Sequence, residues 1–168
     1  MTLTSTLRAT LATGLMTLTM MTPSAAQAPD FVTVVKQISV NRSATEVWKR
    51  IGSYCAIAEW LQVKCEQTSG SGEIGSVRTL NGVTVELMVG KSESSYTYWQ
   101  TAGIMAAYSY HGTLSVESTG PSTSRLTYTL IYNQGAMASD ALRASEHERL
   151  SGRFQGALDA MKKLSEAK

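Results

Sequence analysis

The chain has 168 residues, of which 43% are hydrophobic and 17% charged, and its formal net charge is +2. This length predicts a single domain, and the apolar content is high enough for a packed core, which excludes a disordered chain. Lysine and arginine form no cluster, so nucleic-acid binding is not expected, although seven tyrosines could stack on bases.

The N-terminus has the pattern of a secretory signal peptide. The first 28 residues contain one basic and no acidic side chain, and residues 9–21 form a short, mildly apolar stretch. This stretch is shorter than the ~20 residues of a membrane span, so we expect no stable span. Cleavage is expected after Ala26 or Ala28, leaving residues 29–168 as one periplasmic or secreted domain. The alternatives are an N-terminus without a targeting role and an uncleaved anchor.

Export bears on the two cysteines, Cys55 and Cys65. In an oxidising compartment an even number of cysteines suggests a bridge, so we predict a Cys55–Cys65 disulfide. Zinc needs three or four ligands, and the only histidines, His111 and His147, are far from the cysteines in sequence, so we expect no metal site. The chain shows no Ser/His/Asp order and no glycine-rich phosphate loop, and we expect no cofactor.

The predicted elements begin with a β-branched strand over residues 31–40. Ser43-Ala44-Thr45-Glu46 is a capping box that starts a helix, and Gly52-Ser53 ends it. A second short helix is predicted over Tyr54–Leu61. Further strands are predicted over residues 63–68, 76–80, 83–89, 94–101, 108–117 and 125–132, with Asn81-Gly82 as the turn of a hairpin.

The last predicted element is a long helix that Ser139 or Asp140 caps and that runs to about Ser165. Its apolar side chains are Leu142, Leu150, Phe154, Ala157, Leu158, Met161 and Leu164. Arg149 and Arg153 interrupt the N-terminal half of this line, as a half-filled cavity would require. Because only one long helix can cover the long run of strands, we expect an α+β fold whose sheet closes around the helix and leaves a cavity.

The order of these elements and several short segments resemble the START/Bet v 1-like (SRPBCC) superfamily, in particular its bacterial polyketide cyclase/dehydrase-like branch. The resemblance covers about residues 30–165. The resemblance rests on Ser43–Trp48, Cys55–Trp60 with Cys65, Gly75–Leu80, the Glu86 strand, Tyr98, Tyr110, Thr113–Val116 and the closing helix. It implies a helix-grip fold, in which a curved antiparallel sheet wraps a long C-terminal helix and two short helices follow the first strand. Members bind lipids, sterols, hormones or polyketides, and some are cyclases, dehydratases or lyases.

Arg78 and Glu86 are the first candidates for a catalytic role. They lie on the two arms of the predicted hairpin, not directly opposite when counted from Asn81-Gly82, and the resemblance points both into the cavity. A buried pair could hold a carboxylate or phenolate, or position a proton-transfer group. Two alternatives remain: the pair is exposed or purely structural, or strand alternation buries the neighbouring valines and turns Glu86 outward.

Tyrosines supply the second set of candidates, because six of them share a parity within their predicted strands. They are Tyr96, Tyr98, Tyr108, Tyr110, Tyr128 and Tyr132. If they face inward, they ring the cavity with groups that stack on an aromatic or steroid-like ligand and offer hydroxyls. With an ordinary pKa near ~10, a tyrosine such as Tyr98 or Tyr110 would serve as an acid or oxyanion donor. The alternative is ordinary core packing.

Glu59 and Trp60 end the second predicted helix, near the expected cavity mouth, where Trp60 either covers the site or belongs to the core. The predicted ligand-binding residues are Glu59, Trp60, Tyr96, Tyr128, Tyr132, Arg149, Arg153 and Phe154. His111 is expected on the solvent face.

Three functions remain open for this cavity. The first is binding of a small hydrophobic, aromatic ligand. The second is a cofactor-free cyclase, dehydratase, decarboxylase or other lyase, with Glu86 as proton acceptor and Arg78, Tyr98 or Tyr110 stabilising an enolate or phenolate. The third is a structural protein with a filled core. A cavity below about 150 Å3 would favour the third, because drug-sized ligands need about 300 Å3 or more.

Overall fold

The structure is a computed structural model that describes residues 28–167. The predicted signal peptide lies outside the described residues, apart from Ala28. The strands are β1 (Phe31–Val40), β2 (Cys65–Ser69), β3 (Val77–Leu80), β4 (Thr84–Ser92), β5 (Ser95–Ala102), β6 (His111–Gly120) and β7 (Thr123–Asn133). The helices are α1 (Ala44–Ile51), α2 (Ile57–Trp60) and α3 (Asp140–Glu166), with short 3-10 turns η1 (Ala106–Tyr108) and η2 (Gln134–Ala136).

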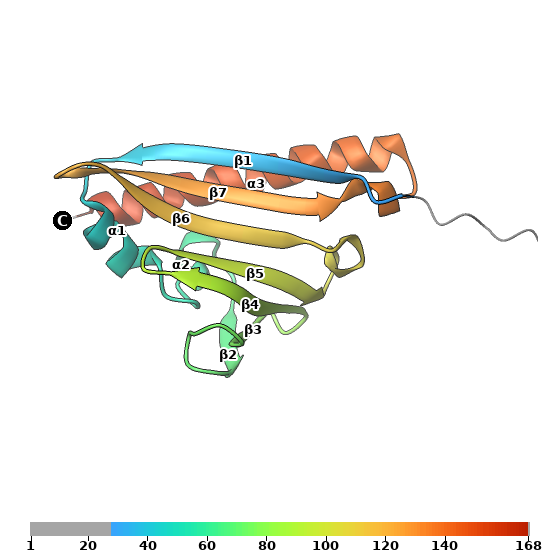
Figure 1. Cartoon of the computed structure of the whole chain (residues 1–168), viewed down its shortest axis with the longest axis horizontal. Coiled ribbons are helices and arrows are strands. Elements are labelled where there is room, and N and C mark those ends of the chain that lie inside the picture. Colours follow the sequence, from blue (N-terminus) through green and yellow to red (C-terminus); the bar gives the residue numbers. More distant parts are fainter. Residues whose placement is uncertain (1–27, 168) are drawn as a thin grey trace, which may run out of the picture.

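The described strands form one antiparallel sheet in the order β1-β7-β6-β5-β4-β3-β2. The long helix α3 lies along β1 and β7 (Figure 1). The short helices α1 and α2 both contact α3, and α1 lies near the end of β1 and the start of β7. This arrangement confirms the predicted helix-grip fold. No helix within residues 28–167 is long and apolar enough to cross a membrane.

The core lies between the inner face of the sheet and α3. The sheet contributes Leu114, Leu126, Tyr128 and Leu130, and the helix contributes Leu150, Phe154, Leu158 and Met161. Burial of these apolar side chains supplies the main driving force that holds α3 in the grip of the sheet. The predicted apolar line of the last helix is therefore confirmed for its central and C-terminal parts, while Leu142 and Leu164 are half-buried.

Helix α1 begins and ends as its sequence predicts. The Ser43 hydroxyl accepts a hydrogen bond from the Glu46 amide, and the Glu46 carboxylate accepts one from the Ser43 amide at 3.2 Å. These two bonds complete the capping box. Gly52 ends the helix, where a Cβ atom would lie 2.5 Å from the Trp48 side chain.

Two predicted elements have different bounds. Helix α2 begins at Ile57, because Tyr54–Ala56 form a turn instead of a first helical turn. Strand β6 begins at His111, because Tyr108 ends the turn η1 and Ser109 adopts a left-handed backbone with a φ of 51°. The parity argument therefore fails for Tyr108, which is half-buried and outside the sheet.

The β3–β4 hairpin differs from its prediction by one residue. Leu80 pairs with Thr84 across a three-residue loop of Asn81, Gly82 and Val83, instead of a two-residue turn. The extra residue shifts the register, so that Arg78 stands directly opposite Glu86. Both side chains therefore leave the sheet on the same face.

This shared face is the inner face of the sheet, so Glu86 points inward and not outward. Glu86 is 3% exposed, whereas Val83 and Val89 are 68% and 40% exposed. The expectation from alternation, that these valines are buried, is wrong here, because the ion pair and not the apolar set occupies the inner face of β3 and β4. Gln100, which pairs with Glu86 from β5, is buried on the same side.

Candidate functional site

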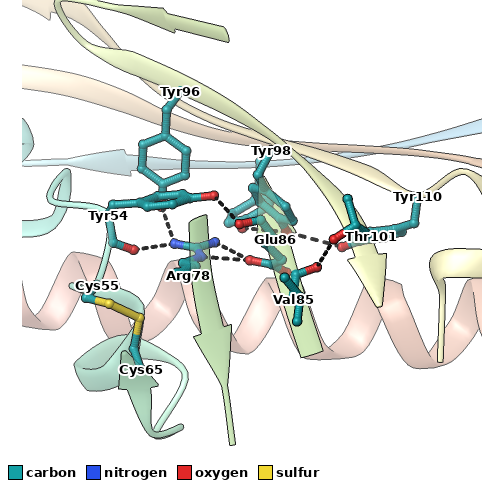
Figure 2. Close-up of polar contacts among 11 residues, drawn as sticks. Tyr54, Cys55, Cys65, Arg78, Val85, Glu86, Tyr96, Tyr98, Thr101 and Tyr110 are labelled. Atoms are coloured by element: carbon teal, nitrogen blue, oxygen red, sulfur yellow. Dashed lines mark hydrogen bonds and ion pairs between the residues drawn. A yellow bond between two sulfur atoms is a disulfide. The ribbon is translucent and has the colours of Figure 1, made fainter. Parts of the chain in front are cut away.

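A buried ion pair joins Arg78 of β3 to Glu86 of β4 on the inner face of the sheet (Figure 2). Arg78 Nε donates a hydrogen bond to Glu86 Oε2 at 2.7 Å, and Arg78 Nη2 lies at the same distance from that oxygen. The other end of the guanidinium, Nη1, donates to the main-chain oxygen of Tyr54. All contacts with Arg78 fall on Oε2, so Glu86 Oε1 has no hydrogen-bond partner among the described residues.

Aromatic rings enclose the guanidinium. Its carbon lies 4.3 Å from the ring centre of Tyr54, 4.9 Å from that of Tyr98 and 5.6 Å from that of Tyr96. Such cation–π contacts stabilise a desolvated cation. The Tyr54 hydroxyl also donates to the main-chain oxygen of Glu86 at 3.1 Å. Arg78 is thus surrounded by three tyrosine rings and hydrogen-bonded through Nε and Nη1, which fixes the position of the carboxylate that it pairs with.

Three tyrosine hydroxyls form a chain beside the ion pair. Tyr98 lies 3.0 Å from Tyr128 and 3.4 Å from Tyr110, measured between hydroxyl oxygens. The longer contact is weak for a hydroxyl–hydroxyl bond, which is usually 2.5–3.0 Å. The Tyr110 hydroxyl makes no other hydrogen bond within residues 28–167, so it can turn toward a bound molecule.

A partly open cavity of about 160 Å3 lies next to these groups, between the β3–β5 part of the sheet and the N-terminal half of α3, with exposed residues such as Ile104 and Arg153 at its mouth. Its polar lining includes Asn81, Thr84, Glu86, Tyr98, Gln100, Tyr110, Arg149 and Arg153. Its apolar lining consists of Ile57, Leu61, Val63, Leu80, Ile104, Met105, Leu150 and Phe154. The lining of the cavity therefore combines eight polar or charged residues with eight apolar ones.

Burial sets the protonation of these groups. It raises the pKa of the Glu86 carboxyl above its ordinary value, and the charge and hydrogen bond of Arg78 offset this only in part. Burial also raises the pKa of the Tyr98, Tyr110 and Tyr128 hydroxyls. The tyrosines are therefore neutral hydrogen-bond donors at neutral pH. The raised pKa of Glu86 makes its carboxyl the better candidate for accepting and releasing a proton.

Six of the sequence candidates line this cavity, namely Glu86, Tyr98, Tyr110, Arg149, Arg153 and Phe154. Arg78 stands directly behind Glu86. Tyr96 and Tyr128 lie one layer further back, where Tyr96 accepts from Arg78 at 3.5 Å and Tyr128 contacts Phe154 at a ring distance of 4.4 Å.

Three candidates lie away from the cavity. Glu59 is exposed and pairs with Arg50 at 2.5 Å, because its position on the short helix α2 faces α1 and solvent. Trp60 is buried and packs edge-on against Tyr128, so it belongs to the core and does not cover the cavity. Tyr132 is fully buried on β7, next to Val32 of the neighbouring strand β1.

Other residues of the site were not predicted. Tyr54 was not predicted because it lies in a turn before α2, where strand parity does not apply. Gln100 has the same parity in β5 as Tyr96 and Tyr98, so strand alternation would have predicted that its side chain points inward. Met105 and Ile104 come from the loop after β5, whose path no sequence pattern indicates.

The predicted disulfide joins Cys55 to Cys65 (Figure 2). It ties the segment that carries α2 to the start of β2. Since Ile57, Leu61 and Val63 belong to this segment, the bond fixes one wall of the cavity.

Sequence comparison assigns the family. A family model described as polyketide cyclase/dehydrase and lipid transport matches residues 32–166. The chain belongs to this family. The match spans the whole helix-grip domain, from β1 to the end of α3, and confirms the resemblance to the START/Bet v 1-like superfamily. A search of curated proteins returns no match.

Solved structures share the fold of this polyketide cyclase-family protein. A protein from Nitrosospira multiformis is 20% identical, with a TM-score of 0.67 over 79% of this chain and 94% of that one. Norcoclaurine synthase from Thalictrum flavum is 19% identical, with a TM-score of 0.63 over 84% and 98%. The Zhui aromatase/cyclase from Streptomyces sp. R1128 is 14% identical, with a TM-score of 0.65 over 82% and 94%. At these identities the likeness concerns the fold alone.

Proposed function

We propose that this protein is exported and binds a small molecule with a single aromatic ring in its internal cavity. The volume of the cavity carries the proposal. About 160 Å3 is close to the ~150 Å3 cavity that accommodates benzene. It is well below the ~300 Å3 that drug-sized ligands need, and it is close to the volume of about 150 Å3 below which a filled core is favoured.

The lining supports an aromatic ligand in particular. Leu61, Leu150 and Phe154 offer apolar contacts for a ring, and burial of that ring would supply most of the affinity. Tyr110 and Gln100 offer hydrogen bonds that would fix its orientation. A steroid or a fused polyketide would extend beyond this volume into the open mouth of the cavity.

Two observations support export. The N-terminal 28 residues have the signal pattern described above, and the Cys55–Cys65 disulfide is typical of proteins that fold in an oxidising compartment. Both favour a periplasmic or secreted protein.

A size series of apolar probes tests the binding function. In calorimetric titrations, benzene and toluene should bind, while naphthalene should bind more weakly and anthracene not at all, because the lining must be displaced to admit further rings. Equal binding of anthracene and benzene would show that the ligand lies outside this cavity. Absence of binding for every probe would favour a filled core.

One observation favours a second candidate, a cofactor-free acid–base enzyme. Glu86 lines the cavity and its Oε1 makes no hydrogen bond with a described residue, so this oxygen can take a proton from a bound molecule. The hydroxyl of Tyr110 or Tyr98 could then donate to the enolate oxygen that forms. Arg78 would act indirectly, by holding the carboxylate in place.

Deuterium exchange tests this chemistry with a single-ring probe. Acetophenone in D2O should lose its methyl protons faster with the wild type than with Glu86→Gln, in which the side chain keeps its shape but cannot accept the proton. The rate should rise with pH through a pKa above the ordinary carboxyl range, because only ionised Glu86 acts as a base. Equal exchange with wild type, variant and buffer would exclude Glu86 as a base.

A further inference from the structure

We propose that the ligand is a single-ring aromatic acid whose carboxylate pairs with Arg153. The proposal rests on the proposed binding function and specifies the chemical class of the ligand. It follows from the charges around the cavity, from the place of Arg153 on α3, and from the polar groups that face it.

The charges that line or back the cavity fall into two neutral pairs and one cation. Glu86 is paired with Arg78 at 2.7 Å. Arg149 is paired with Glu146, which accepts hydrogen bonds from its Nε and Nη2. Arg153 also lines the cavity and makes no ion pair or side-chain hydrogen bond with any of residues 28–167. The empty cavity therefore carries one uncompensated positive charge.

Arg153 lies one turn after Arg149 on the same side of α3, and Phe154 follows it directly. Its charge acts on the Glu86 carboxyl and the Tyr110 hydroxyl, where it lowers the pKa of both against the effect of burial. Arg153 thus lines the cavity together with Glu86 and Tyr110, while Phe154 and Leu150 supply apolar lining from the same helix. A ring packed against Phe154 and Leu150 would bring a polar substituent close to Arg153.

A carboxylate satisfies this arrangement better than a neutral group. The guanidinium fork can donate two parallel hydrogen bonds to its oxygens, and the Tyr110 hydroxyl can donate a third. Arg153 is exposed, so its guanidinium stays hydrated until a ligand binds. An amine would instead meet a like charge.

Benzoate and benzamide are matched probes for this inference, because they share shape and differ in charge. In calorimetric titrations the wild type should bind benzoate about tenfold more tightly than benzamide, as expected for a charge-assisted hydrogen bond that is partly exposed. Added salt should weaken the binding of benzoate and leave the binding of benzamide unchanged. Arg153→Gln should abolish the preference for benzoate and retain benzamide binding. Arg125→Gln, which removes the same charge from an exposed site on β7, should behave as the wild type.

The outcomes separate the inference from the binding function. If both probes bind equally, or if Arg153→Gln weakens both equally, the cavity binds rings but Arg153 does not select an acid, and the inference is wrong. If Arg125→Gln reduces benzoate binding as much as Arg153→Gln, overall charge explains the preference and the inference is again wrong. If neither probe nor benzene binds, the binding function fails and the inference fails with it.

Discussion

At the scale of single residues, the site depends on a charged side chain with no exposed surface. Arg78 is balanced by one carboxylate oxygen of Glu86, a main-chain oxygen and three tyrosine rings. Buried ion pairs lose much of their attraction to desolvation, so a complete set of partners is needed to keep the charge inside. The result is a rigid carboxylate beside the cavity, at the position where chemistry or recognition would use it.

This balance predicts a pH-dependent cost for Arg78→Met. At neutral pH the variant should lose about 3–5 kcal/mol of the free energy of unfolding, because Glu86 is left buried without a partner. Urea unfolding of wild type and variant from about pH 4 to about pH 8 measures this cost.

The sign of the pH dependence follows from Glu86. Its folded-state pKa is raised, so the ionised carboxyl costs stability, and that cost appears as the pH rises through the folded value. Removing Arg78 raises this pKa further. The loss caused by Arg78→Met should therefore be smallest at low pH and grow as the pH rises, and Arg78→Met/Glu86→Gln should show no such growth. A loss that stays constant with pH would mean that Glu86 does not depend on Arg78.

The sequence predicts part of this network. Arg78 and Glu86 were predicted from the family resemblance, and Tyr98 and Tyr110 from the parity that they share within the predicted strands. Glu59 and Trp60 could not be placed, since the rotation of a four-residue helix depends on its contacts with other elements and not on its own pattern. The sequence also does not predict that Arg153 lacks an ion pair among the described residues, because this depends on which arginine of α3 pairs with Glu146.

At the scale of elements, local signals and tertiary context contribute differently. The capping box of α1 was predicted, and the cap of α3 was predicted as Ser139 or Asp140, of which Ser139 is the one observed, because each cap depends on residues three apart in the chain. The β3–β4 loop was predicted one residue too short, since Asn81-Gly82 fits both a two-residue turn and the left-handed part of a three-residue loop. That single residue sets Arg78 opposite Glu86.

The segment closed by the disulfide is the element on which the cavity wall depends. Cys55→Ser/Cys65→Ser should lower the free energy of unfolding by about 2–3 kcal/mol, as expected for a loop of this length. Binding of benzoate should weaken as well, because Ile57, Leu61 and Val63 lose their anchor. Urea unfolding and calorimetry measure the two effects, with reduced wild type as the matched control. Unchanged stability and binding would show that β2 and α2 hold the wall without the bond.

At the scale of the whole molecule, the order of segments predicts the architecture. A run of strands with one long helix at its end leaves the sheet no other cover, and the helix-grip fold follows. The volume of the cavity does not follow from this order. It depends on how far Arg78, Tyr54 and the tyrosines fill the space under the sheet, which only their packing determines. The same fold can therefore hold a large lipid or a single ring.

The central claim is that a single-ring molecule occupies this particular cavity, and chemical-shift mapping tests it most directly. Benzoate added to 15N-labelled protein should shift the amides of Ile57, Leu80, Gln100, Met105 and Leu150, which surround the cavity. Leu150→Phe should suppress these shifts by filling the space while keeping the fold, and Val35→Phe on the exposed face of β1 should not. Shifts confined to the outer face of the sheet, or equal shifts in Leu150→Phe, would contradict the account.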